Sequence, residues 1–233
     1  EYTAPTVPYQ SVEYLRMAYV KATAADENAV LTAACNGVTA TLTSGDSYFK
    51  SLAKALRPGE DNVLTVTVEN GSQTKVYTVT IPMAADPASM GTLELSGCHS
   101  AQVDSLKLYT YTNGTKGAAD LLAGKTPENG QYETLSLAAG SYWVEGYDAN
   151  GDCNGGVKVT VTAGTSSAYK IQRIYQISTN SGWVKDTDYT LTVTVTDADG
   201  NVRPSEAGRA TNWGTVSPSC IFVVGDTVTV TVT

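Results

Sequence analysis

The chain has 233 residues, of which only 16% are charged, and it carries a formal net charge of −8. This length is too great for one typical β-sandwich and suits two or three units of roughly 60 to 100 residues. The acidic balance, with a sequence pI near 4.6, argues against a nucleic-acid-binding surface. The longest uninterrupted apolar run, Cys220 to Val224, is far shorter than the roughly 20 residues that span a bilayer.

The first part of the chain contains a strongly alternating segment, NVLTVTVENGSQTKVYTVTIP, at residues 62–82. Apolar and polar residues alternate through residues 63–68 and again through residues 77–82, which predicts two half-buried strands. Asn70-Gly71 lies between them and favours a tight connection, because a hairpin turn needs positive φ angles. The segment is therefore predicted to be a β-hairpin.

The longer segment ALRPGEDNVLTVTVENGSQTKVYTVTIP, residues 55–82, resembles the end of the cadherin-like β-sandwich domains of bacterial surface proteins. The residues that carry the resemblance are Leu56, Gly59, Asn62, Val66, Val68, Gly71, Tyr77, Thr78, Val79 and Ile81. It extends over about residues 48–82. The resemblance implies a β-sandwich at residues 1–84.

The segment MAADPASMG, residues 83–91, is small and polar and contains a proline, which predicts a linker. After it, apolar residues alternate in pairs and triples between Gly-rich turns, which is typical of an antiparallel sandwich at residues 91–173. The segment LSLAAGSYWVEGYDANGDCNGGVKVTVTAG resembles prealbumin-like surface domains of the carboxypeptidase regulatory-like and Cna protein B-type kinds. The residues that carry this resemblance are Leu137, Gly140, Tyr142, Val144, Gly155 and Val159.

A third alternating segment, YTLTVTVTDADGNVRP, begins at Tyr189 and contains the turn signal Asp199-Gly200. VTVTDADGNV followed by GTVSPS resembles the bacterial immunoglobulin-like (Ig-like) modules of adhesins and stalks. This resemblance implies a third sandwich at residues 174–233. That length is short for a complete sandwich and the chain stops directly after a strand, so we expect the natural polypeptide to continue.

Together these segments predict an all-β fold, built as a tandem array of small antiparallel Ig-like or prealbumin-like β-sandwiches. The predicted units are residues 1–84, 91–173 and 174–233.

The four cysteines are widely scattered, without the paired C-x-x-C spacing of a structural zinc site. Cys98 and Cys153 form the one pair inside a predicted unit and are the candidate disulfide. The alternative, which we favour, is that the cysteines are buried free thiols. The single histidine, His99, follows Cys98 directly, and adjacent strand residues point to opposite faces, so a catalytic Cys-His pair is not expected. We predict no catalytic residues, no cofactor and no enzymatic activity.

The segment YDANGDCNGG places oxygen-bearing side chains at alternate positions, as a calcium loop does. The weak calcium candidates are Asp148, Asn150 and Asp152. Asp, Asn and Gly also dominate ordinary hairpin turns. We favour the turn and predict no metal site.

Aromatic residues suggest one binding site. If Tyr142 and Val144 face the core, then Trp143 and Tyr147 lie on the outer face with Glu145 between them. Such a strip can stack on sugar rings. Equally, it can pack against a neighbouring domain or a crossing loop, because large aromatic residues are more often buried than exposed.

The resemblances imply a fragment of a secreted or surface-anchored bacterial protein that is non-catalytic and serves as a stalk or adhesin. Its location is then extracellular, on the bacterial cell surface, and its partner is a host protein or a glycan. We expect a monomer without nucleic acid and without a transmembrane segment in this fragment. The alternatives are a carbohydrate- or protein-binding module, and accessory domains of a larger extracellular enzyme.

Overall fold

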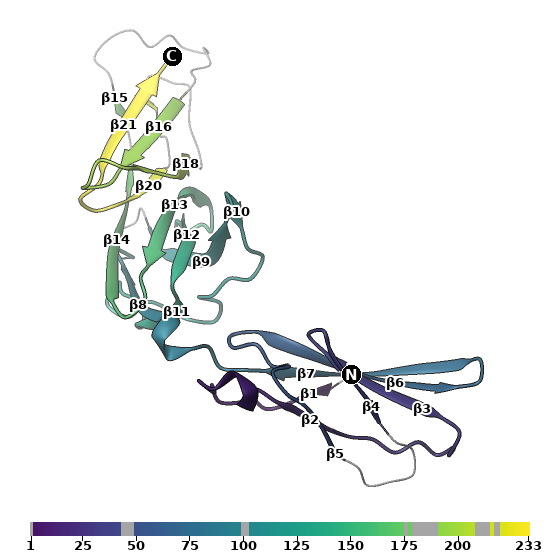
Figure 1. Ribbon diagram of the computed structural model, residues 1–233. Helices are drawn as coiled ribbons and strands as arrows, with labels where there is room; N and C mark the ends of the chain where they lie inside the picture. Colours follow the sequence, from purple (N-terminus) through teal and green to yellow (C-terminus); the bar gives the residue numbers. More distant parts are fainter. Residues whose placement is uncertain are drawn as a thin grey trace. The chain divides into compact units, whose positions relative to one another are not determined.

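The computed structural model describes residues 2–42, 49–98, 103–174, 177–178, 191–207, 215–216 and 220–233. The chain divides into two compact units, Glu1–Ser89 and Met90–Thr233 (Figure 1). Both units consist of β-strands, and the described residues hold no α-helix, only two 3₁₀ turns, η1 (Glu13–Leu15) and η2 (Pro87–Ser89). The prediction of an all-β fold is confirmed.

The first unit contains a five-stranded sheet in the order β1-β7-β6-β3-β4 and a two-stranded sheet, β2-β5. Its strands are β1 (Tyr2–Thr3), β2 (Ala18–Lys21), β3 (Val30–Cys35), β4 (Val38–Leu42), β5 (Phe49–Leu52), β6 (Asp61–Asn70) and β7 (Gln73–Pro82). Every pair is antiparallel except β1 with β7. Alternate residues of β2, β3 and β6 enter one apolar core, which includes Val20, Leu31, Ala33, Leu52 and Leu64.

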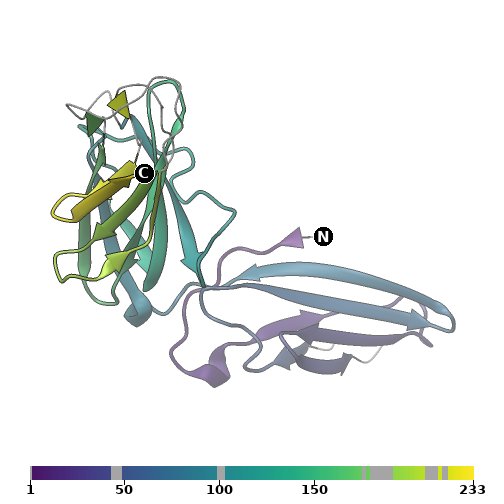
Figure 2. The same ribbon diagram turned by 90° about the horizontal axis from the view of Figure 1, so that it is seen from above.

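The hairpin predicted at residues 62–82 is formed by β6 and β7, which pair from Asp61 with Pro82 to Asn70 with Gln73. Figure 2 shows it as the long blue pair of strands in the first unit. The turn itself is Gly71-Ser72, because Asn70 is the last residue of β6 and only Gly71 has a positive φ, of 59°. Glycine adopts this left-handed backbone without steric cost, which explains its place at the turn.

A buried asparagine fixes the loop that leads into β6. The Asn62 amide donates to the carbonyl oxygens of Arg57, Glu60 and Ile81 at 3.0 to 3.2 Å, and its oxygen accepts the backbone N–H of Arg57 at 2.7 Å. Because a buried polar group is costly unless it is hydrogen-bonded, this full set of partners explains why the sequence holds Asn at a strand position that faces the interior.

The second unit is organised around a nine-stranded sheet in the order β10-β9-β12-β13-β18-β20-β14-β8-β11. Its strands are β8 (Met90–Ser96), β9 (Ser105–Thr112), β10 (Thr115–Lys116), β11 (Leu135–Ala138), β12 (Gly140–Tyr147), β13 (Cys153–Val161), β14 (Ser166–Ile174), β18 (Ser205–Ala207) and β20 (Cys220–Val223). Smaller sheets are formed by β16 (Leu191–Thr196), β17 (Val202–Arg203) and β21 (Thr227–Val232), and by β15 (Ile177–Ser178) with β19 (Thr215–Val216). The core includes Leu93, Leu108, Val144, Val159 and Ile171.

The sequence predicted a third unit from residue 174, whereas the structure groups Met90–Thr233 as one compact unit. The reason is strand pairing: β18 pairs with β13, and β20 pairs with β14, so strands from beyond residue 174 complete the sheet that begins at Met90. Ile221 and Val223 of β20 enter the same core as Leu93. The predicted start of the third unit near Tyr175 lies outside the described residues.

An ion pair also links the C-terminal strands to the rest of the second unit. The Arg203 guanidinium donates to both carboxylate oxygens of Asp226, at 2.7 and 3.1 Å, and to the Lys158 carbonyl of β13 at 3.1 Å. Both side chains are largely buried, at 14% and 4% exposed. The C-terminal three-stranded sheet is therefore attached to the main sheet by a charge-assisted contact.

Candidate functional site

The residues that the sequence analysis singled out lie on β12, between β9 and β13. Tyr142 and Val144 belong to the apolar core. Trp143 and Glu145 alternate with them and lie on the opposite face of the sheet. Both Trp143 and Glu145 are nevertheless buried in the structure. We refer to this outer surface as the aromatic face, and it consists of Lys107, Tyr109, Tyr111, Lys116, Trp143, Glu145 and Tyr147.

Trp143 is packed within the aromatic face and is only 6% exposed. Its indole stacks on the Tyr111 ring, with the centroids 5.0 Å apart and the planes at 22°. On β13, a Cβ atom at Gly156 would lie 2.3 Å from the indole Nε1, so the missing side chain provides the space that the indole fills. The sequence left open packing against a neighbouring domain or a crossing loop, whereas here the indole packs within its own sheet. The partners are neighbouring strands of the same sheet.

Glu145 is buried beside Trp143 and its charge is neutralised locally. Lys116 of the short strand β10 donates to Oε1 at 2.5 Å, and the Tyr147 hydroxyl donates to Oε2 at 2.8 Å. The bond to Glu145 raises the pKa of Lys116. Burial, followed by the bond to the Glu145 carboxylate, raises the pKa of Tyr147 well above its ordinary value.

Two cation–π contacts complete the aromatic face. The Lys116 ammonium lies 4.4 Å from the centroid of the Tyr109 ring, and the Lys107 ammonium lies 4.4 Å from that of Tyr147. The lysines are exposed, whereas the rings that they cover are buried or half-buried. The arrangement holds neighbouring strands together through the Lys116–Glu145 pair and the two cation–π contacts, and its accessible rim is formed by Lys107, Tyr111 and Lys116.

The calcium candidates form a tight turn between β12 and β13. One Asp148 carboxylate oxygen accepts the backbone N–H groups of Asn150 and Asp152, each at 3.0 Å. The Gly151 N–H bonds to the Asp148 carbonyl at 2.8 Å, with φ of 79° at Gly151. This geometry is that of an Asx turn. Across the described part of the chain, His, Cys, Asp and Glu side chains do not gather in threes as a metal site requires.

Cys98 and Cys153 are both free thiols, so the candidate disulfide is not present in the structure. Burial raises the pKa of the Cys98 thiol to about 11, which holds it in its protonated and unreactive form at neutral pH. Cys35 and Cys220 are also free and are buried. His99, the neighbour of Cys98, lies outside the described residues.

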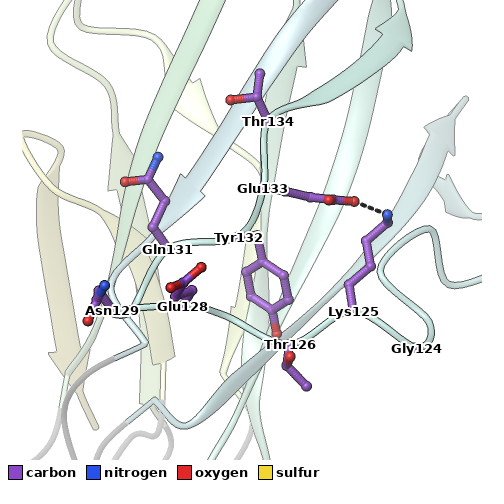
Figure 3. Close-up of a pocket in the computed structure, with 9 residues that line it drawn as sticks. All are labelled: Gly124, Lys125, Thr126, Glu128, Asn129, Gln131, Tyr132, Glu133 and Thr134. Carbon is purple, nitrogen blue, oxygen red and sulfur yellow. Dashed lines mark hydrogen bonds and ion pairs between the residues drawn. The ribbon is translucent and has the colours of Figure 1, made fainter.

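The second unit has an open depression that was not predicted from the sequence, formed by the loop between residues 124 and 134 (Figure 3). It has a volume of about 830 Å³, and its lining is mostly polar. Lys125 and Glu133 form an ion pair across it. The Tyr132 ring is buried, and its hydroxyl accepts the Leu106 N–H at 3.0 Å. The one feature of the sequence that could have predicted a turn in this loop is the dipeptide Asn129-Gly130, in which both residues have positive φ angles.

The first unit has a second depression, of about 590 Å³, with a more apolar lining. Small side chains from the segment before β3 form one wall, and Val66, Val68 and Tyr77 of the long hairpin form the other. Asp26 closes one end through a hydrogen bond from Asn70 at 2.7 Å.

No helix in the described residues has the length and apolar character needed to cross a membrane.

Comparison with protein-family models and with curated proteins gives no match for this chain. Among solved structures, a chimeric titin Z1Z2 is similar at 14% identity, covering 72% of this chain and 92% of that one, with a TM-score of 0.26. Sidekick-1 immunoglobulin domains 1–4 are similar at 12% identity, covering 94% and 62%, with a TM-score of 0.25. Drosophila OTK extracellular domains 3–5 are similar at 8% identity, covering 99% and 92%, with a TM-score of 0.24. Identities and scores this low identify neither a shared family nor a shared ligand.

Proposed function

We propose that this chain is a non-catalytic structural fragment of an extracellular protein of the bacterial cell surface, where its β-sheet units act as spacers. Each unit encloses an apolar core of its own, one around Leu31 and Leu64 and the other around Leu108 and Val144. A unit with its own core keeps its shape whatever adjoins it, which is the property that a spacer needs.

The observation that carries this proposal is that the side chains of the aromatic face bind one another and leave little of their surface for a ligand. Trp143, the residue best suited to stack on a sugar, already stacks on Tyr111 and lies close against the Gly156 backbone. Glu145, the carboxylate beside it, is already bonded to Lys116 and Tyr147. These side chains stabilise the sheet, and opening them to a ligand would cost the packing that holds β9, β12 and β13 together.

An array of glycans and extracellular-matrix proteins tests the proposal, with the parent chain and Lys107→Ala compared side by side. Lys107 lies on the rim, so its loss leaves the core intact. We expect neither protein to be retained, although both unfold cooperatively. Specific retention of the parent, abolished in Lys107→Ala at an unchanged melting temperature, would overturn the spacer function and make the aromatic face a recognition site.

The depression lined by residues 124–134 favours a second function, a carbohydrate- or protein-binding module. Its hydroxyl, carboxylate and amide groups, such as those of Thr126, Glu128 and Asn129, suit a ligand rich in hydroxyl groups. In the same array, Glu128→Ala and Thr134→Val report on this alternative. A ligand retained by the parent and by Lys107→Ala, but lost in these two variants, would locate binding at the depression.

A further inference from the structure

The N-terminal segment of the first unit runs alongside the last segment of that unit, in the same direction. Tyr2 and Thr3 of β1 pair in parallel with Val79 and Thr80 of β7. Val7 forms a parallel bridge with Met83. Residues 2–9 therefore lie beside residues 79–86 over their whole length, and we refer to this contact as the terminal zipper.

Beyond the pairing of β1 with β7, further hydrogen bonds follow one another along the terminal zipper. The Ala4 N–H donates to the Thr80 carbonyl at 2.7 Å, and the Val7 N–H donates to the Pro82 carbonyl at 2.8 Å. In the opposite direction, the Ala84 N–H donates to the Val7 carbonyl at 2.9 Å. At the far end, the Tyr9 hydroxyl donates to the Asp86 carboxylate at 2.9 Å.

Arg16 holds the Tyr9 ring in place for its hydrogen bond to Asp86. The Arg16 guanidinium lies 5.5 Å from the centroid of the Tyr9 ring, and its Nε donates to the Gln10 carbonyl at 2.8 Å. The bond to Asp86 raises the pKa of Tyr9, so the hydroxyl keeps the proton that it donates. Asp86 directly precedes η2, where the chain passes toward Met90. The zipper therefore ends at the point where the chain leaves the first unit.

We propose that the terminal zipper is the force-bearing clamp of the first unit. When the unit is pulled at its two ends, Tyr2 is drawn one way along the strand axis and Asp86 the other. Because the two segments are parallel, the pull slides them past each other and loads all the bonds at once, in shear. An antiparallel pair at the same ends would instead open one bond at a time.

The use of this clamp in the cell rests on the proposed spacer function, because only a spacer between two attachment points is stretched end to end. The clamp itself follows from the register of residues 2–9 with residues 79–86 and is tested separately.

The experiment is single-molecule stretching of the whole chain by its ends, with Ala4→Pro compared with the parent. Proline removes the N–H that bonds to Thr80 and suits an extended edge segment, so the fold of the unit is kept. One of the bonds that share the load is lost, so we expect the unfolding force of the first unit to fall clearly below that of the parent. That unit is identified by the smaller length that it releases.

Ala40→Pro is the matched control. Ala40 lies in β4, which is at the edge of the sheet, and it pairs with Ala33 of the neighbouring strand β3. Because a two-residue turn, Asn36-Gly37, joins these strands, the Ala33–Ala40 pair is a hydrogen-bonded one. The same Ala-to-Pro change therefore removes a backbone bond outside the zipper. We expect Ala40→Pro to lower the melting temperature at least as much as Ala4→Pro does, while the unfolding force stays close to that of the parent.

A second measurement uses the parent sequence and changes only the direction of pull. With one handle at the N-terminal end and the other inserted at the Asn70-Gly71 turn, Tyr2 is peeled from Val79 first, and we expect a lower force than in end-to-end pulling. Equal forces in the two geometries, or an unchanged force in Ala4→Pro, would overturn the clamp and leave the array result intact. A glycan retained on the array would overturn the spacer function and leave the clamp intact.

Discussion

At the scale of single residues, Gly156 is the position on which the aromatic face depends. A Cβ atom there would lie within 2.5 Å of three indole atoms of Trp143, and the indole also stacks on Tyr111. We therefore expect Gly156→Ala to lower the free energy of unfolding by about 1 to 3 kcal/mol, as overpacking of a closed site does. Urea unfolding followed by circular dichroism measures the change.

Gly140→Ala is the control for this prediction. Gly140 begins the same strand, β12, and a Cβ atom there meets nothing within 4 Å. Its effect should stay within about 0.5 kcal/mol of the parent. Equal losses at the two positions would mean that the missing side chain of Gly156 is unrelated to Trp143.

Tyr147 and Lys116 give the second unit a dependence on alkaline pH. The folded state raises the pKa of both groups, Tyr147 mainly through burial and Lys116 mainly through its bond to Glu145. A raised pKa means that the folded state holds its proton more tightly than the unfolded chain. The stability that this contributes is present below about pH 10 and is lost as the pH rises above the ordinary tyrosine and lysine values.

We expect the melting temperature of the parent to fall between pH 9 and pH 11, and to fall less steeply in Tyr147→Phe, which has no hydroxyl to ionise. Tyr77→Phe is the control, because Tyr77 is exposed on the first unit. If both variants follow the slope of the parent, the protonation of Tyr147 is not coupled to folding.

Parity along β12 was enough to predict on which face of the sheet Trp143 and Glu145 lie, because side chains alternate along a strand. It was not enough to predict that this face is covered. The cover comes from Tyr111 and Lys116, which reach Trp143 and Glu145 only through the pairing of β9 with β12 and the fold-back of β10. These are contacts between residues distant in the sequence, and alternation within one strand carries no information about them.

At the scale of elements, the ion pair between Arg203 and Asp226 joins β17, the turn after β20, and β13. Removing one partner leaves the other charge buried without compensation. We expect Arg203→Ala to lower the free energy of unfolding of the second unit by about 3 kcal/mol. Thermal unfolding that resolves the two units measures this, and the first unit should be unaffected.

Arg57→Ala provides the comparison, because Arg57 pairs with Glu60 at 3.7 Å on the exposed surface of the first unit. Exposed pairs contribute about 0 to 1 kcal/mol. A loss at Arg203 as small as that at Arg57 would show that the strands beyond residue 174 do not depend on this contact.

Among the elements, the β6–β7 hairpin was predictable because its pattern and its turn are local. The expected boundary at residue 174 differs from the structure because β18 and β20 are inserted between β13 and β14 in the sheet order. Strands that are adjacent in the sequence usually pair, so a sequence is naturally divided where one alternating run ends. Pairing of β14 with β8 and β20, which lie far from it along the chain, breaks that rule here.

At the scale of the whole molecule, the division at Ser89 predicts that stretching unfolds the chain in two separate steps. At about 3.5 Å per residue, and before subtraction of the folded lengths, the extended chain should lengthen by near 30 nm when Glu1–Ser89 unfolds and by near 50 nm when Met90–Thr233 unfolds. Three events, with the longer length divided near residue 174, would instead support the three units expected from the sequence.

The terminal zipper also sets an order of events during synthesis. The partners Tyr9 and Asp86 are 77 positions apart, so the N-terminal segment leaves the ribosome long before the strand beside which it lies. At about 5 to 20 residues per second, its partner follows roughly 4 to 15 seconds later. The β3–β4 hairpin, with its short sequence separation, has ample time to form in that interval. Within the first unit, the segment made first is thus among the last to be incorporated, and the unit gains its lengthwise strength only when its final strand arrives.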